Sequence, residues 1–237
     1  MLITRNTVNK RFTVKIMFEN ISWDKSGIEI EKESFRIIDE LATDECCKNF
    51  SAQEWHVVRR LIHTTADFSI SKDVKIRHNA IEVILQKLHE GATIISDSNM
   101  IKSGLSVPKL QKFNKNYSRG AIKCFISDED VIAKAKQNHT TRALAAVGKA
   151  YQENLIDNCI FLCGNAPLAL AQIIKFIVEK NVKPAAIIGM PVGFVNVCES
   201  KELLQYISIP HITLEGHRGG SPLAVAALHG VMENELN

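Results

Sequence analysis

His63 is the side chain in this sequence best suited to move a proton. It stands one helical turn beyond Arg59 near the end of an apolar helix pattern, and Arg60 falls off that face. An imidazole is close to half protonated near neutral pH, so His63 could act as a general acid or base, while one of the two arginines forms a salt bridge. The ordinary alternative is a solvated histidine, or one that caps the helix.

A glycine-rich stretch near the C-terminus predicts an anion site. It reads Glu215-Gly-His-Arg-Gly-Gly-Ser221-Pro222 and leads into a helix pattern. Backbone N–H groups, the helix dipole and the two cations could together face an anion. The alternative is a flexible loop in which Ser221 caps the helix and Pro222 begins it. The chain has neither G-x-G-x-x-G after a strand nor a P-loop, so a nucleotide cofactor would lack its usual cradle.

Other candidate motifs decide less. Thr140-Thr-Arg142 begins a predicted helix with two hydroxyls and a guanidinium, a set suited to a carboxylate or phosphate, although threonine there is also an ordinary cap. Cys46-Cys47 has no histidine motif nearby, no G-x-S-x-G elbow is present, and metal-ligand spacing is missing. The residues alone therefore predict an anion-binding domain with one acid-base histidine, and they leave the substrate open.

Length and composition indicate a folded cytoplasmic protein. The chain has 237 residues, 46% of them apolar and 23% charged, and a net charge of +3, which falls short of the basic stripe of a nucleic-acid binder. The longest charge-free stretch, residues 158–174, contains Gly, Asn, Pro and Gln and is not a membrane span of about 20 apolar residues. Cysteines in apolar surroundings indicate buried thiols in a reducing compartment. We expect neither nucleic acid nor membrane as a partner.

The first third of the chain predicts one strand followed by helices. Apolar residues alternate over 12–18, which indicates an extra N-terminal edge strand and argues against a processed leader. An apolar stripe over 30–41 predicts a helix, and a capping box at Ser51 and Glu54 opens another that ends near His63. A third helix is expected from Asp73 to Glu90.

The remaining two thirds predict an α/β fold with an open, mostly parallel five-stranded sheet flanked by helices. The expected strands are Ala92 to Ile95, Ala121 to Ile126, Cys159 to Cys163, Ala185 to Met190 and His211 to Leu214. The expected helices are Asp128 to Gln152 with a break near His139, Pro167 to Glu179, Glu199 to Tyr206 and Ser221 to Glu235. Alternation of strands and helices is typical of a parallel sheet.

Polar and glycine residues follow these strands, and in a parallel sheet they gather at the carboxyl edge, where ligands bind. Some of this pattern is generic, because loops need turn residues. The residues concerned are Asp97 and Asn99, Ser127 and Asp128, Gly164 and Asn165, Gly193 and Asn196, and Glu215 to Arg218.

The sequence resembles the precorrin-8X methylmutase family in segments that run in order from about residue 24 to the C-terminus. They are Ser34-Phe-Arg-Ile-Ile, Arg59-Arg-Leu-Ile-His63-Thr-Thr-Ala-Asp67, Asp97-Ser-Asn-Met100 with Gly104, Thr140-Thr-Arg142-Ala, Gly164-Asn-Ala-Pro167, Val192-Gly-Phe-Val-Asn196 with Glu199-Ser-Lys201, and Gly216-His-Arg-Gly-Gly-Ser221. We therefore expect an N-terminal extension over 1–23 and one domain over 24–237. Two departures, His217 and Thr64-Thr65, bear on substrate preference.

The resemblance implies a cytoplasmic isomerase of cobalamin biosynthesis that needs no cofactor or metal and forms a homodimer. It would move a methyl group between neighbouring carbons on ring C of precorrin-8 or cobalt-precorrin-8, giving hydrogenobyrinic or cobyrinic acid. His63 takes the role of general acid or base. Polar residues would bind the tetrapyrrole, and we expect them to be Ser34, Arg59, Asp97, Asn99, Arg142, Asn165, Asn196, Gly216, His217, Arg218, Gly219, Gly220 and Ser221.

Two other functions stay open at this point. A non-catalytic tetrapyrrole carrier would use the same pocket without turnover. A phosphosugar-type isomerase would bind phosphate in the Gly216 to Ser221 loop and use His63 as its base.

Overall fold

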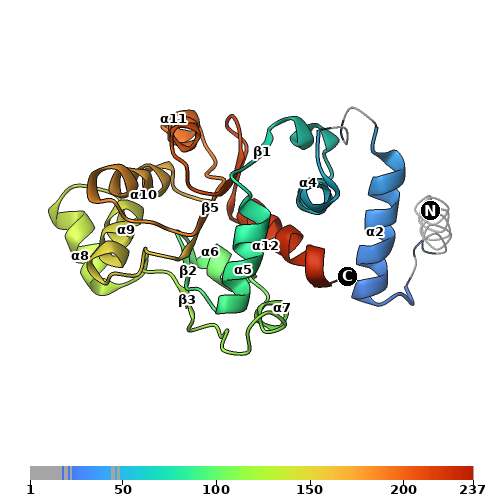
Figure 1. Cartoon of the computed structure of the whole chain (residues 1–237), viewed down its shortest axis with the longest axis horizontal. Coiled ribbons are helices and arrows are strands. Elements are labelled where there is room, and N and C mark those ends of the chain that lie inside the picture. The colour runs from blue at the N-terminus through green and yellow to red at the C-terminus, as the bar shows by residue number, and fades with distance from the viewer. Residues whose placement is uncertain (1–17, 19–20, 22, 44–45, 47–48, 237) are drawn as a thin grey trace, which may run out of the picture. The chain divides into compact units, whose positions relative to one another are not determined.

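The computed structural model describes residues 18, 21, 23–43, 46 and 49–236 (Figure 1). The chain divides into two compact units, Met1–Glu40 and Leu41–Asn237. The N-terminal strand predicted over residues 12–18 lies outside the described residues, except for Phe18.

The first unit contains most of helix α2 (Gly27–Leu41), which confirms a helix in this stretch. The backbone N–H and the hydroxyl of Ser26 both donate to the carboxylate of Glu29, at 2.7 Å each, and so hold the start of the helix. Within the expected apolar stripe Phe35 and Ile38 are buried, whereas the outer positions 30 and 41 are exposed.

The second unit is built on a six-stranded sheet in the order β1-β6-β5-β4-β2-β3. Its strands are β1 (Val74–Arg77), β2 (Ile94–Ser96), β3 (Ile122–Lys123), β4 (Ile160–Cys163), β5 (Ala186–Gly189) and β6 (His211–Leu214). The last five run parallel to one another and fall within the predicted apolar runs, except that β2 extends one residue further, to Ser96. The α/β class and the mostly parallel sheet are therefore confirmed.

Strand β1 shows that two expectations were wrong, the count of five strands and the helix over 73–90. It pairs antiparallel with β6, with Val74 opposite Leu214, and the helix α5 covers only Ala80–Glu90. His78 (φ 57°) and Asn79 (φ 53°) adopt left-handed conformations and turn the chain between strand and helix. A strand of four residues carries little periodic signal, and its stability comes from the hydrogen bonds with β6.

Helices cover both faces of this sheet (Figure 1). They are α4 (Ala52–Thr65), η1 (Phe68–Lys72), α5, α6 (Asn99–Gly104), α7 (Val107–Leu110), α8 (Glu129–Gln137), α9 (Arg142–Gln152), α10 (Pro167–Lys180), α11 (Val197–Glu202), η2 (Leu203–Tyr206) and α12 (Ser221–Leu236). The predicted break near His139 separates α8 from α9. The helix expected from Glu199 begins at Val197 and ends in the 3-10 turn η2.

Helix α4, which carries His63, packs along α12. Its predicted capping box is present, because Ser51 and Glu54 bond each other's backbone N–H groups. Arg60 forms the expected salt bridge through Nε, which donates to Glu233 Oε1 at 2.5 Å, and both side chains are buried. Burial raises the pKa of Glu233, and the charge of Arg60 opposes that shift. Among the described residues, no helix combines the length and apolarity needed to cross a membrane.

Candidate active site

The strand order reverses at β2. From β2 the chain moves outward to β3 and then crosses back to β4 on the other side of β2. In an open parallel sheet such a reversal leaves a crevice at the carboxyl ends of the strands, where ligands bind. Asp97 and Asn99 follow β2 and Asn165 follows β4, so the structure brings these three predicted residues to the reversal point.

Asp97 is buried and binds the chain itself. Its Oδ1 accepts the backbone N–H of Gly164 at 3.0 Å, and its Oδ2 accepts those of Asn165 at 2.8 Å and Ala166 at 2.7 Å. Burial raises the pKa of the carboxyl group, whereas these three hydrogen bonds lower it. The carboxylate therefore holds the loop between β4 and α10 in place.

Asn99 and Asn165 are exposed beside this buried carboxylate. The Asn99 amide donates to Ser127 Oγ at 2.8 Å and so links the ends of β2 and β3. The hydroxyls of Ser98 and Ser221 lie 2.8 Å apart and join the end of β2 to the start of α12. The exposed amides of Asn99 and Asn165 thus lie next to hydrogen bonds that join the ends of β2 and β3 and the start of α12.

Two glycines of the Gly216 to Ser221 loop are required by the structure, Gly219 by close packing and Gly220 by its backbone conformation. A Cβ on Gly219 would lie 2.3 Å from the carbonyl oxygen of Met190 and 2.4 Å from that of Pro191. The N–H of Gly220 donates to the Met190 carbonyl at 2.8 Å, and its φ is 131°. Only glycine fits this approach to the segment after β5.

Lys201 holds the backbone of the same loop through two hydrogen bonds. Its buried Nζ donates to the carbonyl oxygens of Gly216 at 2.8 Å and of Arg218 at 2.5 Å. Burial lowers the pKa of Lys201 to about 8. The lysine therefore orders the loop backbone and leaves the loop's side chains facing outward.

His217 is exposed on this loop and is tied to the segment after β5. Its Nδ1 lies 2.8 Å from the carbonyl oxygen of Gly193, and its own carbonyl accepts the Gly193 N–H at 3.3 Å. The rings of His217 and Phe194 lie 5.0 Å apart between centroids, with 32° between their planes. Two loops of the carboxyl edge are thus joined by backbone and by side chain.

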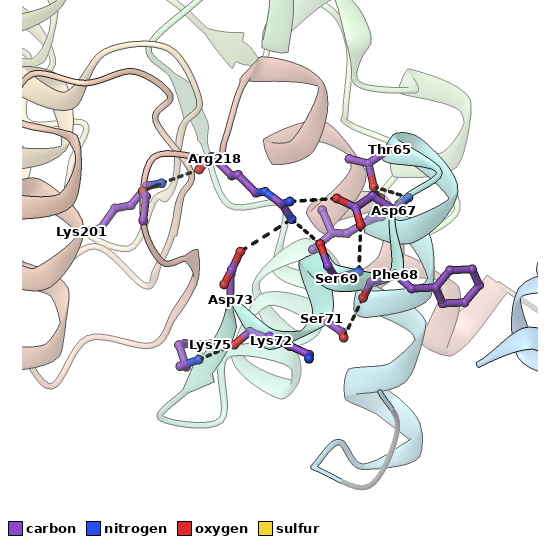
Figure 2. A network of polar contacts seen from close by, with 12 residues as sticks. Thr65, Asp67, Phe68, Ser69, Ser71, Lys72, Asp73, Lys75, Lys201 and Arg218 are labelled. Atoms are coloured by element: carbon purple, nitrogen blue, oxygen red, sulfur yellow. Dashed lines mark hydrogen bonds and ion pairs between the residues drawn. The ribbon is translucent and has the colours of Figure 1, made fainter. Parts of the chain in front are cut away.

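Arg218 points the other way, toward the segment between α4 and β1 (Figure 2). Its guanidinium lies 3.0 Å from Asp67 Oδ2, donates to Ser69 Oγ at 3.0 Å, and lies 3.8 Å from Asp73 Oδ2. The pKa of Asp67 is lowered by its hydrogen bonds with Ser69 and by the charge of Arg218. The predicted cation of the anion site therefore already faces two carboxylates.

His63 occupies the last turn of α4 and is partly buried. The hydroxyls of Thr64 and Thr65 donate back to helix carbonyls at 2.8 Å and 2.9 Å, and the left-handed Ala66 (φ 53°) ends the helix. Because Asp67 then pairs with Arg218, the end of α4 lies beside the loop after β6.

Comparison with known proteins decides the family. Residues 29–234 match the family model of precorrin-8X methylmutase. The chain belongs to this family. It is 46% identical over 213 residues to the cobalt-precorrin-8 methylmutase of Leptospira interrogans, covering 87% of this chain and 93% of that protein. It is 30% identical over 213 residues to the precorrin-8X methylmutase of Pseudomonas aeruginosa, covering 89% and 97%.

The fold agrees with this assignment. A solved precorrin-8X methylmutase from Thermus thermophilus aligns with a TM-score of 0.77 at 40% identity, covering 87% of this chain and 95% of that one. Precorrin-8X methylmutases are isomerases of cobalamin biosynthesis, so the family and the enzyme class expected from the sequence are confirmed.

Three predicted site residues of this methylmutase, Arg59, Arg142 and Ser34, lie on helices outside the loops that follow the strands. Arg59 Nη2 lies 3.8 Å from the buried Glu233 carboxylate. Arg142 begins α9, whereas Lys149, about 10 Å further along that helix, bonds Asp128 directly before α8. Arg142 therefore lies about 10 Å along α9 from the contact between Lys149 and Asp128. Ser34 lies on α2 in the first unit.

Asn196 and Lys201 both belong to helix α11 and its start. Asn196 is exposed and left-handed (φ 60°) at the start of α11. Lys201 is the residue that sequence reasoning missed as an anchor, because a lysine on a short polar helix reads as a solvated cation. Only the fold shows that it is buried under two carbonyl oxygens.

Proposed function

We propose that this methylmutase moves a methyl group between neighbouring carbons of ring C in precorrin-8, with or without cobalt, giving hydrogenobyrinic or cobyrinic acid. The observation that carries the proposal is the Arg218–Asp67 pair, because it places the helix end bearing His63 beside the loop at the carboxyl edge. The migration leaves no group to hand on, so the protein holds the macrocycle in a reactive conformer and His63 supplies or accepts a proton. No cofactor is needed for this scheme.

The substrate carries several carboxylates and needs distributed donors. We assign this contact to the exposed side chains of Asn99, Asn165 and Asn196 at the carboxyl edge, together with the backbone of Gly216, and we expect His217 to contact the macrocycle at the same edge. The loops that carry these contacts are ordered by a second group of residues, namely Asp97, Arg218, Gly219, Gly220 and Ser221. Arg59 lies beside the buried Glu233. Ser34 and Arg142 remain substrate contacts on the family resemblance alone.

The visible absorbance of precorrin-8 during incubation with the purified protein tests this function, because methyl migration changes the conjugated system. A change to a corrin spectrum is expected. Binding without that change would indicate a tetrapyrrole carrier. Binding of inorganic phosphate with no affinity for corrins would indicate the phosphosugar-type isomerase.

We also propose a domain organisation, an oligomeric state and a cellular location for this enzyme. We infer that residues 24–237 work as one domain, that the enzyme is a homodimer, and that it acts in the cytoplasm; the family match over 29–234 supports the first of these. Light scattering on the purified protein checks the dimer, and a monomer that turns over at full rate would contradict it.

A further inference from the structure

We propose that His217 is an axial ligand for the cobalt ion of a cobalt-containing precorrin, which adapts this site to the metal-bound form of its substrate. The inference rests on the proposed function and names the substrate form that the same site takes. It concerns the exposed imidazole on the loop after β6.

Hydrogen bonding fixes which ring nitrogen of His217 is available. Nδ1 lies 2.8 Å from the carbonyl oxygen of Gly193, and a carbonyl can only accept, so Nδ1 carries the proton. In the neutral imidazole the lone pair is then on Nε2. Within the described part of the chain, the polar contact recorded for Nε2 is a weak one to Cys198 Sγ at 3.8 Å.

The surroundings hold the imidazole in one orientation. The Phe194 ring packs against it at 5.0 Å between centroids, and Cys198 Sγ lies at nearly equal distances from Nδ1 and Nε2, 3.7 Å and 3.8 Å. Lys201 and the close approach at Gly219 fix the backbone on which the ring is mounted. A ligand that is ordered beforehand loses little conformational entropy on binding.

This arrangement matches the way proteins present histidine to metals. A metal-binding histidine usually donates its second ring N–H to a carbonyl or carboxylate, which fixes the tautomer and raises the basicity of the other nitrogen. Among the described residues no group of three His, Cys, Asp or Glu could hold a metal ion by itself. A tetrapyrrole supplies the equatorial nitrogens to its cobalt, so one axial imidazole is sufficient.

The contact is a dative bond. The Nε2 lone pair occupies an axial position of the cobalt, replacing water there, and no electron is transferred. His217 and Phe194 are exposed, Phe194 by 87%, so a flat macrocycle can reach them at the carboxyl edge. A relative with 46% identity is named as a cobalt-precorrin-8 methylmutase, which makes the cobalt form the relevant one to test.

Electron paramagnetic resonance of the full-length protein with cobalt(II) cobyrinic acid tests the ligand. The wild-type complex should show a nitrogen superhyperfine triplet, which becomes a doublet when the histidines are labelled with nitrogen-15. His217→Asn is the matched variant, because its amide can still donate to the Gly193 carbonyl but offers no ring nitrogen. It should lose the splitting, whereas His63→Ala should keep it.

Affinities give a second measure. The preference for cobalt(II) cobyrinic acid over metal-free hydrogenobyrinic acid should fall about tenfold or more in His217→Asn. A wild-type complex without nitrogen splitting overturns the proposal, and so does splitting lost in His63→Ala and retained in His217→Asn. A spectral change lost only in Cys198→Ser would assign the contact to sulfur and also overturn it.

These outcomes are separable from the proposed function. If precorrin-8 is converted to a corrin while the cobalt complex shows no nitrogen splitting, the ligand assignment fails and the methylmutase function stands. If the protein neither binds either corrin nor converts precorrin-8, the proposed function fails, and the assignment of His217 fails with it.

Discussion

Arg218 and Asp67 form an ion pair, with 3.0 Å between Nη2 and Oδ2, that joins the loop after β6 to the segment directly after His63 (Figure 2). The same guanidinium donates to Ser69 and lies near Asp73, so it bonds one short segment at several points. An exposed pair of this kind contributes little to stability. Its consequence is positional, because it sets where His63, the proposed acid-base residue, stands relative to the glycine-rich loop.

Weakening this pair should slow turnover without unfolding the protein. Arg218→Lys keeps the charge but loses the planar guanidinium that reaches Asp67 and Ser69 together, and we expect kcat to fall about tenfold with little change in Tm. Steady-state assays and thermal unfolding check this. If the two residues act through one contact, Asp67→Asn combined with Arg218→Lys should lose no more activity than the more damaging single variant.

Removing the imidazole of His63 should separate binding from chemistry. His63→Ala is expected to bind the corrin product but to lower kcat by about 10²- to 10⁴-fold, the usual contribution of a general acid or base. His89→Ala is the matched control, since His89 is exposed on α5 and pairs with Glu235. Full turnover in His63→Ala would show that the protein contributes conformation alone.

The buried Lys201 should make the free energy of unfolding increase with pH. Burial lowers its pKa from 10.5 to about 8, so between these values the unfolded chain binds more protons than the folded one. This group's contribution to the free energy of unfolding is therefore present above pH 10.5 and lost as the pH falls through 8. Urea unfolding should show wild type gaining stability over Lys201→Met as the pH rises through this window, with the exposed Lys175→Met as control.

A methyl group at Gly219 should be damaging where one at Gly148 is not. The Cβ of Gly219→Ala would meet the Met190 carbonyl at 2.3 Å, and we expect a loss of about 1–3 kcal/mol in the free energy of unfolding. Nothing lies within 4 Å of a Cβ at Gly148, on α9, so Gly148→Ala should be neutral or stabilising by up to about 1 kcal/mol. Equal effects would refute the packing argument.

Deleting the carboxylate of Asp97 should release the loop after β4. Asp97→Ala leaves three backbone N–H groups without their acceptor, at about 1–3 kcal/mol each, so a loss of about 3 kcal/mol or more is expected in denaturant unfolding. Asp24→Ala, at an exposed position, should show no comparable loss.

Local patterns in the sequence were sufficient for the parts of the fold that are stabilised locally. The capping box at Ser51, the helix stop at Gly91 and the buried apolar runs of β4 and β5 each lie within a short window, so their physical cause is visible there. The polar residues that follow β2 and β4 in the sequence also predict that Asn99 and Asn165 lie at one edge of the sheet.

The sequence by itself determined the fold class and, through the resemblance, the family, and it predicts a site at the carboxyl edge of the sheet. Only the tertiary structure decided that Val74–Arg77 is a strand, that Lys201 is buried beneath loop carbonyls, and that Arg218 faces Asp67. The physical reason is the same in each case. These features depend on a hydrogen bond or ion pair between segments far apart in the chain, and no local periodicity records such a partner.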